Sequence, residues 1–286
     1  MADFSDVLLT VDFDHTMTGT DARIPERNLE AVRWFMAHGG TFTVNTGRSL
    51  TTLRSFLDVI PHNAPLLLYN GSVAYEKGKI VDCTPIGLDM WDTVCTVAEA
   101  FPELNLELQG VHNHYLVNQK PDYVAFYDAQ GWGHAPAVPG TDVGPFLKFA
   151  LFGVVHDLRL SRMYEATEEE LRRFREVEDF IRSRWGDQVD LFYAAPRVLD
   201  VQAKGVSKLA AAKKLQTSLG KKILVCVGDG DNDVPMLEGA DYAFCPSDAV
   251  VADRFSNVCP CNEGAVADVI YKKIPEILGF SLDSRE

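Results

Sequence analysis

The chain has 286 residues, of which 47% are hydrophobic and 24% charged, as in ordinary soluble globular proteins. Its 27 lysines and arginines face 41 aspartates and glutamates, and the net charge of −14 disfavours nucleic acid and anionic membranes as partners. No apolar run approaches the roughly 20 residues of a membrane span, and the acidic N-terminus lacks the basic region of a signal peptide. We therefore expect a cytoplasmic protein, with its oligomeric state left open. The closest cysteines, Cys259 and Cys261, have no second pair nearby, which disfavours a disulfide framework or a zinc site.

The first part of the chain alternates predicted strands and helices. Apolar runs rich in β-formers predict strands at 7–11, 41–45 and 66–69. Pro25 opens a helix that Gly39-Gly40 closes, a second helix runs from Leu50 to Pro61, and a hairpin turns at Lys77-Gly78. Repeated βα units of this length predict a parallel, doubly wound, Rossmann-like sheet.

A mixed α+β segment interrupts this pattern at 84–202. It contains a predicted helix near 91–101, strands at 104–109, 115–118 and 146–155, and a loop rich in glycine and proline at 131–145. Thr167 and Glu170 form a capping box that opens a charged helix, and strands at 188–193 and 197–202 follow. The βα pattern then resumes with helices at 206–218 and 264–278 and strands at 223–227 and 242–245. We predict a core domain of residues 1–83 and 203–286 with an inserted cap domain at 84–202.

Chemistry-bearing residues follow three of the predicted core strands. Asp12-Phe13-Asp14-His15-Thr16 ends the first, Asn45-Thr46-Gly47-Arg48 the second, and Gly228-Asp229-Gly230-Asp231-Asn232-Asp233 the strand at 223–227. Ligands of doubly wound sheets bind outside the carboxyl ends of the strands, so these clusters are expected to converge. Carboxylates that converge repel one another unless a cation lies among them, and hard oxygen ligands suit Mg²⁺.

Other interpretations of these clusters fit less well. A lone Asp-x-Asp is usually a solvated loop or a helix cap. The series Asp229, Asp231, Asp233 is not a calcium loop, because Val234 stands where the loop needs Gly and Ala240 where it needs Glu. The first strand leads into no Gly-x-Gly-x-x-Gly, which excludes the dinucleotide fingerprint.

Taken in order, the motifs resemble those of the haloacid dehalogenase (HAD) superfamily, and more narrowly its Cof-type branch of capped phosphatases. The resemblance rests on Asp12 to Thr16, Thr46-Gly47-Arg48, Lys208 and Gly228 to Asp233, and it extends to Tyr69-Asn70-Gly71 and Gly205-Val206-Ser207-Lys208. That branch includes sugar-phosphate phosphatases and phosphomannomutase-like proteins. The family usually has Gly at the position of His15 and a branched aliphatic residue at that of Met17, which could alter the mouth of the site.

The resemblance implies a Mg²⁺-dependent phosphoric monoester hydrolase that works through an aspartyl-phosphate. Asp12 would be the nucleophile and Asp14 the general acid and base, while Thr46 and Lys208 would bind and neutralise the phosphoryl group. The implied metal ligands are Asp12, Asp14 through its carbonyl, Asp229 and Asp233. Implied phosphate-binding residues are Gly47, Arg48, Asn70, Gly71 and Asn232.

Several alternatives stay open at this stage. Lys204 also precedes Asp229 and is a second candidate for the lysine that neutralises the phosphoryl group. The stretch Gly205-Val206-Ser207 before the alanine-rich helix favours Lys208. Arg48 could contact the substrate phosphate or be a plain surface residue. His15 could tune proton transfer or simply face solvent. In the cap, His112, His114, Asn118, Gln119 and Lys120 could bind sugar hydroxyls, although the polar face of a half-exposed sheet is the simpler interpretation.

The expected substrate is a small phosphorylated metabolite, foremost a sugar phosphate, because a cap shields a small ligand from water. One alternative is a phosphomutase or phosphotransferase of the same superfamily, which shares the aspartyl-phosphate step. Another is a Mg²⁺-binding regulatory module without turnover.

Overall fold

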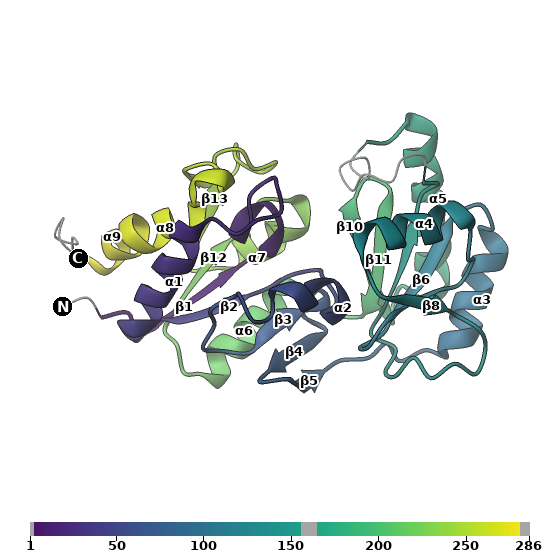
Figure 1. The fold of residues 1–286 in the computed structure, drawn as a ribbon, viewed down its shortest axis with the longest axis horizontal. Coiled ribbons are helices and arrows are strands. Elements are labelled where there is room, and N and C mark those ends of the chain that lie inside the picture. Colours follow the sequence, from purple (N-terminus) through teal and green to yellow (C-terminus); the bar gives the residue numbers. More distant parts are fainter. Residues whose placement is uncertain (1–2, 156–164, 281–286) are drawn as a thin grey trace. The chain divides into compact units, whose positions relative to one another are not determined.

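In a computed structural model, which describes residues 3–155 and 165–280, the chain folds into two compact units. The first comprises the residues up to Gly47, Phe56–Asp82 and the residues from Ser207, and the second comprises Arg48–Ser55 and Cys83–Val206. Both ends of the chain, purple and yellow in Figure 1, thus contribute to the first unit. None of the helices in the described ranges is long and apolar enough to cross a membrane.

The first unit is built on a parallel five-stranded sheet in the order β14-β13-β12-β1-β2. Its strands are β1 (Val7–Val11), β2 (Thr41–Val44), β12 (Ile223–Val227), β13 (Tyr242–Pro246) and β14 (Ser256–Val258). β1 lies at the centre between β12 and β2, with every one of its residues buried, as the continuous apolar run predicted. The predicted α/β fold with a parallel sheet is confirmed.

Helices cover the sheet of the first unit. They are α1 (Glu26–Ala37), α6 (Lys208–Ser218), α7 (Val234–Glu238), α8 (Ala265–Asp268) and α9 (Ile274–Leu278). Leu8, Leu224 and Cys226 of the sheet share one apolar cluster with α6 and α7. Helices α1 and α8 pack against each other and are seen side by side in Figure 1. Because side chains alternate along a strand, Leu8 and its buried neighbours Val7 and Leu9 point to opposite sheet faces, so the core extends to both.

A three-stranded sheet of β3 (Leu66–Leu68), β4 (Val73–Glu76) and β5 (Lys79–Cys83) also belongs to the first unit, apart from Cys83 at the end of β5. Lys77 and Gly78 join β4 to β5 with positive φ angles of 50° and 80°. Two consecutive residues with positive φ are typical of the tight turn between antiparallel strands, which is the turn that the sequence predicted.

The helix predicted from Leu50 to Pro61 is wrong in its length. The structure has only α2 (Leu50–Leu53) and a 3₁₀ turn at Arg54–Phe56. Two threonines favour non-helical backbone there, and Arg48 donates from its guanidinium to the Thr52 carbonyl, which a continuing helix would use. The segment Arg48–Ser55 also belongs to the second unit, whereas the sequence analysis placed it in the core domain.

The second unit is a six-stranded sheet in the order β10-β11-β9-β6-β7-β8, with helices on both faces. Its strands are β6 (Asn105–Gln109), β7 (His114–Leu116), β8 (His134–Pro136), β9 (Lys148–Phe152), β10 (Val189–Ala195) and β11 (Val198–Ala203). Helices α3 (Met90–Ala100) and α5 (Glu168–Trp185) share an apolar cluster with one sheet face, and α4 (Pro121–Gln130) with the other. The capping box of Thr167 and Glu170 is present at the start of α5, as predicted.

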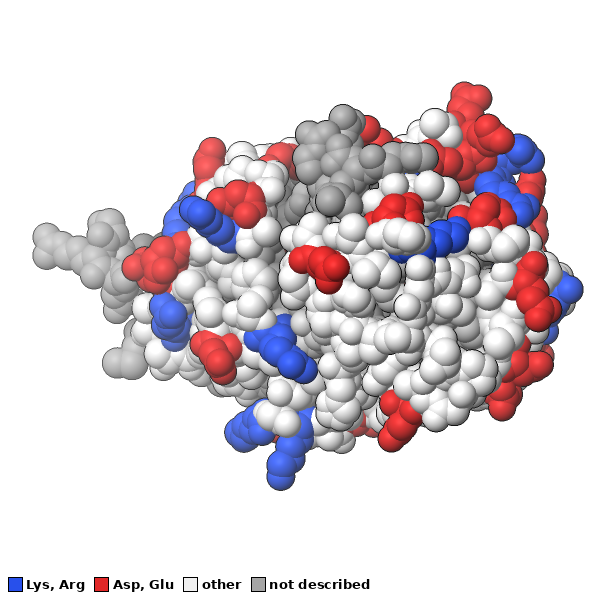
Figure 2. All heavy atoms as spheres, turned by 45° about the vertical axis from the view of Figure 1, so that its right-hand side comes forward, with Lys and Arg blue, Asp and Glu red and all other residues white. Residues whose placement is uncertain are grey.

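The sequence pattern did not predict β8, β14, α7 and α4. In helix α4 the aromatic residues Tyr123, Phe126 and Tyr127 recur at helical spacing and are buried in one cluster, and Pro121 at its first turn and Gly131 in a left-handed C-cap were further usable signals. Figure 2 shows acidic and basic side chains scattered over the face that it presents, with uncharged surface between them.

Candidate active site

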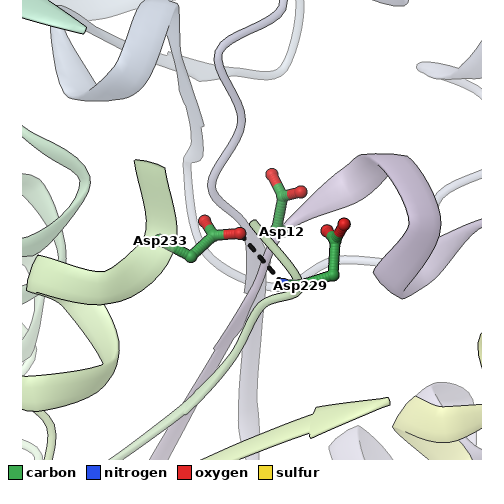
Figure 3. Close-up of side chains that lie close together, drawn as sticks. All are labelled: Asp12, Asp229 and Asp233. Atoms are coloured by element: carbon green, nitrogen blue, oxygen red, sulfur yellow. Dashed lines mark hydrogen bonds between the residues drawn. The ribbon is translucent and has the colours of Figure 1, made fainter. Parts of the chain in front are cut away.

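Three carboxylates meet at the carboxyl ends of β1 and β12. Asp12 directly follows β1, and Asp229 and Asp233 come from the loop and short turn after β12. One carboxylate oxygen of each lies within 4.8 Å of the others, and Figure 3 shows the three side chains converging. Because parallel neighbours end at the same sheet edge, residues far apart in the sequence are brought together here.

Lys208 is inserted among these acids from the start of α6. Its ammonium lies 2.5 Å from Asp12 Oδ1 and 2.6 Å from Asp233 Oδ1, and its side chain is 2% exposed. Lys204, the other candidate, is half exposed and pairs with Asp190 of the second unit. The structure therefore joins Lys208, and not Lys204, to the acidic cluster.

Asp233 holds the loop that carries Asp229. Its Oδ2 accepts hydrogen bonds from the backbone N–H groups of Asp229 at 3.0 Å and Gly230 at 3.1 Å, the first of which is drawn in Figure 3. A Cβ on Gly228 would stand 2.6 Å from Asp233 Cγ, so the close approach of this loop requires glycine.

Burial governs the electrostatics of the cluster. Burial and the nearby Asp233 carboxylate raise the pKa of Asp12 well above its usual range, and Lys208 offsets only part of this effect. Burial and Asp233 likewise raise the pKa of Asp229 to about 7. For Lys208, burial acts to lower the pKa, but Asp12 and Asp233 outweigh it and the pKa is raised, so the lysine is charged.

Asp14 lies beside this cluster on the loop after β1. It is partly exposed, and its charge acts on Asp12, contributing to the raised pKa of that carboxyl. The next residue, His15, has a left-handed backbone with φ of 54°. Glycine adopts this conformation without steric cost, which gives a physical reason for the glycine that the family usually has there.

The loops after β2 and β3 meet each other and the start of α6. The Asn70 N–H donates to the Thr46 carbonyl at 2.9 Å, and a Cβ on Gly47 would stand 2.8 Å from Asn70 Oδ1. Gly71 has φ of +100°, and a Cβ there would stand 2.7 Å from the Ser207 carbonyl. Thr46, Gly47, Asn70 and Gly71 are thereby brought together next to the helix that begins at Lys208.

The two remaining predicted residues, Asn232 and Arg48, each have a local contact. The side chain of Asn232 is partly buried and stands over Gly230, where a Cβ would be 2.7 Å from its Oδ1. Arg48 is the first residue of the second unit and donates to Thr52 within α2.

Sequence reasoning assigned no role to Thr16 and Asn45. The hydroxyl of Thr16 donates to Asp229 Oδ1 at 3.0 Å and so orients that carboxylate. Asn45 Nδ2 donates to the Lys208 carbonyl at 2.8 Å and holds the first residue of α6. Asn45 is fully buried at the end of β2, and a polar residue in such a place was a usable signal.

Comparisons with known proteins identify the family of this chain. The model of the haloacid dehalogenase-like hydrolases matches residues 9–270. Over 273 residues the chain is 24% identical to the 5-amino-6-(5-phospho-D-ribitylamino)uracil phosphatase YbjI of Escherichia coli, covering 93% of this chain and 95% of that protein. A Bacillus subtilis protein of the same named activity, YcsE, is 24% identical over 249 residues, or 85% of this chain and 84% of that protein.

Solved structures share the fold. A sugar phosphatase of HAD subclass IIB superposes with a TM-score of 0.70 at 20% identity, covering 95% of this chain and 98% of that one. The expected identification as a phosphoric monoester hydrolase of the Cof type is confirmed by these relatives together with the family match. The chain therefore belongs to the haloacid dehalogenase-like hydrolases.

Proposed function

We propose that the protein is a Mg²⁺-dependent phosphatase that hydrolyses small phosphomonoesters, foremost sugar phosphates, through an aspartyl-phosphate intermediate. The observation that carries this proposal is the placement of Asp12, a buried carboxylate at a sheet edge, between one ammonium and two further carboxylates. A nucleophile in this position lies beside an ammonium that can neutralise a phosphoryl group and beside carboxylates that can bind a cation.

The residues fit a divalent cation. Asp12, Asp229 and Asp233 bring three carboxylates to one buried point, and Lys208 is the ammonium that contacts two of them. Buried carboxylates in excess over cations repel one another, and oxygen ligands of this kind suit Mg²⁺. Asp12, Asp229 and the Asp14 carbonyl would hold the ion, and Asp233 would complete or orient that set. Bound there, Mg²⁺ would supply the positive charge that lets an anionic carboxylate approach an anionic phosphoryl group.

The reaction proceeds in two displacements. An Asp12 carboxylate oxygen attacks phosphorus, the ester P–O bond breaks, and Asp14 gives its proton to the departing alkoxide. Asp14 then takes a proton from water as that water attacks phosphorus, and the bond between phosphorus and Asp12 breaks to release inorganic phosphate. Both carboxyls return to their starting states.

The other motif residues bind the phosphoryl oxygens. Lys208 neutralises part of their charge from its position beside Asp12. Thr46 and Gly47, with Asn70 and Gly71, offer hydroxyl, amide and backbone donors from adjoining loops. We assign Asn232 and Arg48 to phosphate binding from the family motif alone.

The substrate class follows from the relatives and from the charge of the chain. Two relatives are named for a substrate with a phosphorylated ribityl chain, and a structural neighbour is a sugar phosphatase. The net charge of −14 disfavours nucleic acid and anionic membranes as partners. We infer a cytoplasmic enzyme of small phosphorylated metabolites, with 84–202 as its cap.

Phosphate release from a panel of sugar, polyol and aryl phosphomonoesters tests the proposal, with and without Mg²⁺. We expect Mg²⁺-dependent release that Asp12→Asn loses. Transfer of phosphate to a sugar hydroxyl faster than to water would replace hydrolysis by a mutase activity. A long-lived phosphorylated Asp12 without release would indicate a regulatory module.

A further inference from the structure

A single turn of π-helix, Phe13–Met17, follows directly after Asp12 at the end of the central strand. We call it the π turn. Its backbone is irregular: Asp14 is extended, with φ of −72° and ψ of 135°, and His15 is left-handed, with φ of 54°. A left-handed backbone is unfavourable for a residue that has a Cβ, and such a conformation persists where surrounding contacts enforce it. The π turn therefore depends on contacts that hold it from outside.

Met17, the last residue of the π turn, is bound through both of its backbone polar groups. Its N–H donates to the Asp12 carbonyl at 3.2 Å, a bond that closes the turn on the proposed nucleophile. Its carbonyl accepts a hydrogen bond from Asn28 Nδ2 at 3.0 Å. Met17 alone thus separates the Asn28 side chain from the backbone of Asp12.

Asn28 is itself held firmly in the core of the first unit. It is the third residue of α1, and it is fully buried. Its Oδ1 accepts a hydrogen bond from the Ala267 N–H at 3.0 Å. Ala267 lies in the first turn of α8, where N–H groups have no partner inside the helix. The amide of Asn28 therefore ties the π turn to α1, which carries the side chain, and to α8.

Capping of α8 does not by itself explain an amide at this position. An aspartate would accept the same hydrogen bond from Ala267, and its charge would be favoured at the N-terminus of a helix. A carboxylate has no donor for the Met17 carbonyl, however, whereas an amide both accepts and donates. The amide donor of Asn28 is thus the feature that serves the π turn.

The π turn carries two residues that the reaction would use. Asp14 is the proposed general acid, and the hydroxyl of Thr16 donates to Asp229 Oδ1 at 3.0 Å. A turn that loses its outside contact would let both side chains move. Misplacement of a catalytic group by about 1 Å can lower a rate about a hundredfold. The contact between Asn28 and Met17 should therefore matter for catalysis as well as for folding.

We propose that Asn28 is a positioning residue of the reaction, which fixes the π turn through the Met17 carbonyl; this inference rests on the proposed function. Held in this way, Asp14 lies where it can give its proton to the departing alkoxide, and Thr16 keeps its hydrogen bond to Asp229. Asn28 itself contacts no reacting atom. The effect of losing it should therefore grow with the need of the ester for an acid.

Two esters with different leaving groups measure that need. The alkoxide of ribitol 5-phosphate requires a proton as its P–O bond breaks, whereas p-nitrophenolate is stable as an anion and leaves without one. The ratio kcat/KM covers the steps up to this bond cleavage, in which the acid acts. We expect Asn28→Ala to lower kcat/KM for ribitol 5-phosphate about tenfold more than kcat/KM for p-nitrophenyl phosphate, since a general acid contributes roughly 10²–10⁴-fold in all.

Asn63→Ala is the matched control. Asn63 belongs to the same unit, and its amide also makes two bonds to the backbone: Nδ2 donates to the Gly40 carbonyl at 2.9 Å and Oδ1 accepts from the Phe42 N–H at 2.8 Å. These bonds lie at the start of β2, away from the carboxyl ends of the strands. The control therefore loses the same kinds of hydrogen bond, and it should affect the two esters equally.

A second comparison places the effect on Asp14. Asp14→Asn removes the acid, so adding Asn28→Ala to it should change the relative rates of the two esters no further. If Asn28→Ala does not fold, Asn28→Asp takes its place, because it keeps the size of the side chain and the acceptor for Ala267 and loses the donor to Met17.

Each outcome separates the inference from the proposed function. Equal losses for both esters in a folded Asn28 variant, or an unequal loss in Asn63→Ala, would overturn the inference and leave the phosphatase intact. Absence of release from every ester by the wild type would overturn the proposed function. Calorimetric titration with MgCl₂ then decides the inference, because the π turn also carries Thr16, which contacts Asp229. It requires that the Asn28 variant binds Mg²⁺ about tenfold more weakly than the wild type and Asn63→Ala, and any other result would overturn it.

Discussion

The ammonium of Lys208 lies 2.5 Å from the Asp12 carboxylate, although 196 positions separate the two residues in the sequence. Asp12 ends the central strand and Lys208 begins the helix that packs on the same sheet. Both side chains are buried, so neither charge is compensated by water. The pair therefore links the proposed nucleophile to the proposed counter-charge.

Replacing the nucleophile should stop turnover without unfolding the protein. Asp12→Asn keeps the size of the side chain and removes the charge that attacks phosphorus. We expect phosphate release to fall by about a thousandfold or more, with an unfolding temperature close to that of the wild type. Near-wild-type release by this variant would remove Asp12 from the reaction.

Replacing the lysine should affect both activity and stability. Lys208→Met leaves Asp12 and Asp233 without their shared ammonium, and breaking such a buried pair destabilises a protein by about 3–5 kcal/mol. We expect that loss in denaturant titrations without Mg²⁺, together with a fall in kcat of about a hundredfold or more. The matched variant Lys204→Met removes a half-exposed lysine and should change little. Equal effects of the two variants would argue against the assignment of Lys208.

Mg²⁺ should stabilise the folded protein. A ligand that binds only the folded state at about ten times its Kd adds about 1.4 kcal/mol, which is a rise of a few degrees in the unfolding temperature for a chain of this size. We expect this rise in thermal unfolding of the wild type and its loss in Asp229→Asn, while a chelator stops phosphate release. Asp231→Asn is the control, because Asp231 is exposed in the same loop. Turnover that persists with a chelator would contradict the proposed metal site.

Acid should weaken the contact between α1 and α8. Burial acts to raise the pKa of Asp268, but Lys272 and Arg27, which lies 2.6 Å away, outweigh it and lower the pKa below its ordinary 3.8. A lowered folded-state pKa contributes stability that is present above pH 3.8 and is lost as the pH falls through the folded-state value. Asp268→Asn should therefore destabilise the protein by about 1 kcal/mol at neutral pH and by less in acid.

Denaturant titrations from pH 7 downward measure this difference. Asp253→Asn, at an exposed position of the same unit, serves as the control and should show no such pH dependence. A difference between wild type and Asp268→Asn that stays constant down to acid pH would mean that the ion pair does not set the stability of this contact.

Local pattern was sufficient to predict most of the core fold. The strands Val7–Val11 and Ile223–Val227 have the predicted bounds, because a buried parallel strand is a short apolar run that can be recognised without its neighbours. Lys77-Gly78 and the capping box of Thr167 and Glu170 were equally recognisable, since turns and caps depend on a few adjacent residues. The acids that follow those strands also predicted where the cluster would form.

The tertiary structure alone decided what depends on contacts between distant residues. It brought Lys208, which the sequence pattern already favoured over Lys204, into contact with Asp12 and Asp233. It shortened the predicted helix after Leu50, where the Arg48 side chain binds a helix carbonyl. It also decided which strands of the second unit pair with one another, because no local pattern encodes that pairing. The sequence by itself thus determined the type of chemistry and its strands, whereas long-range packing decided which side chains meet.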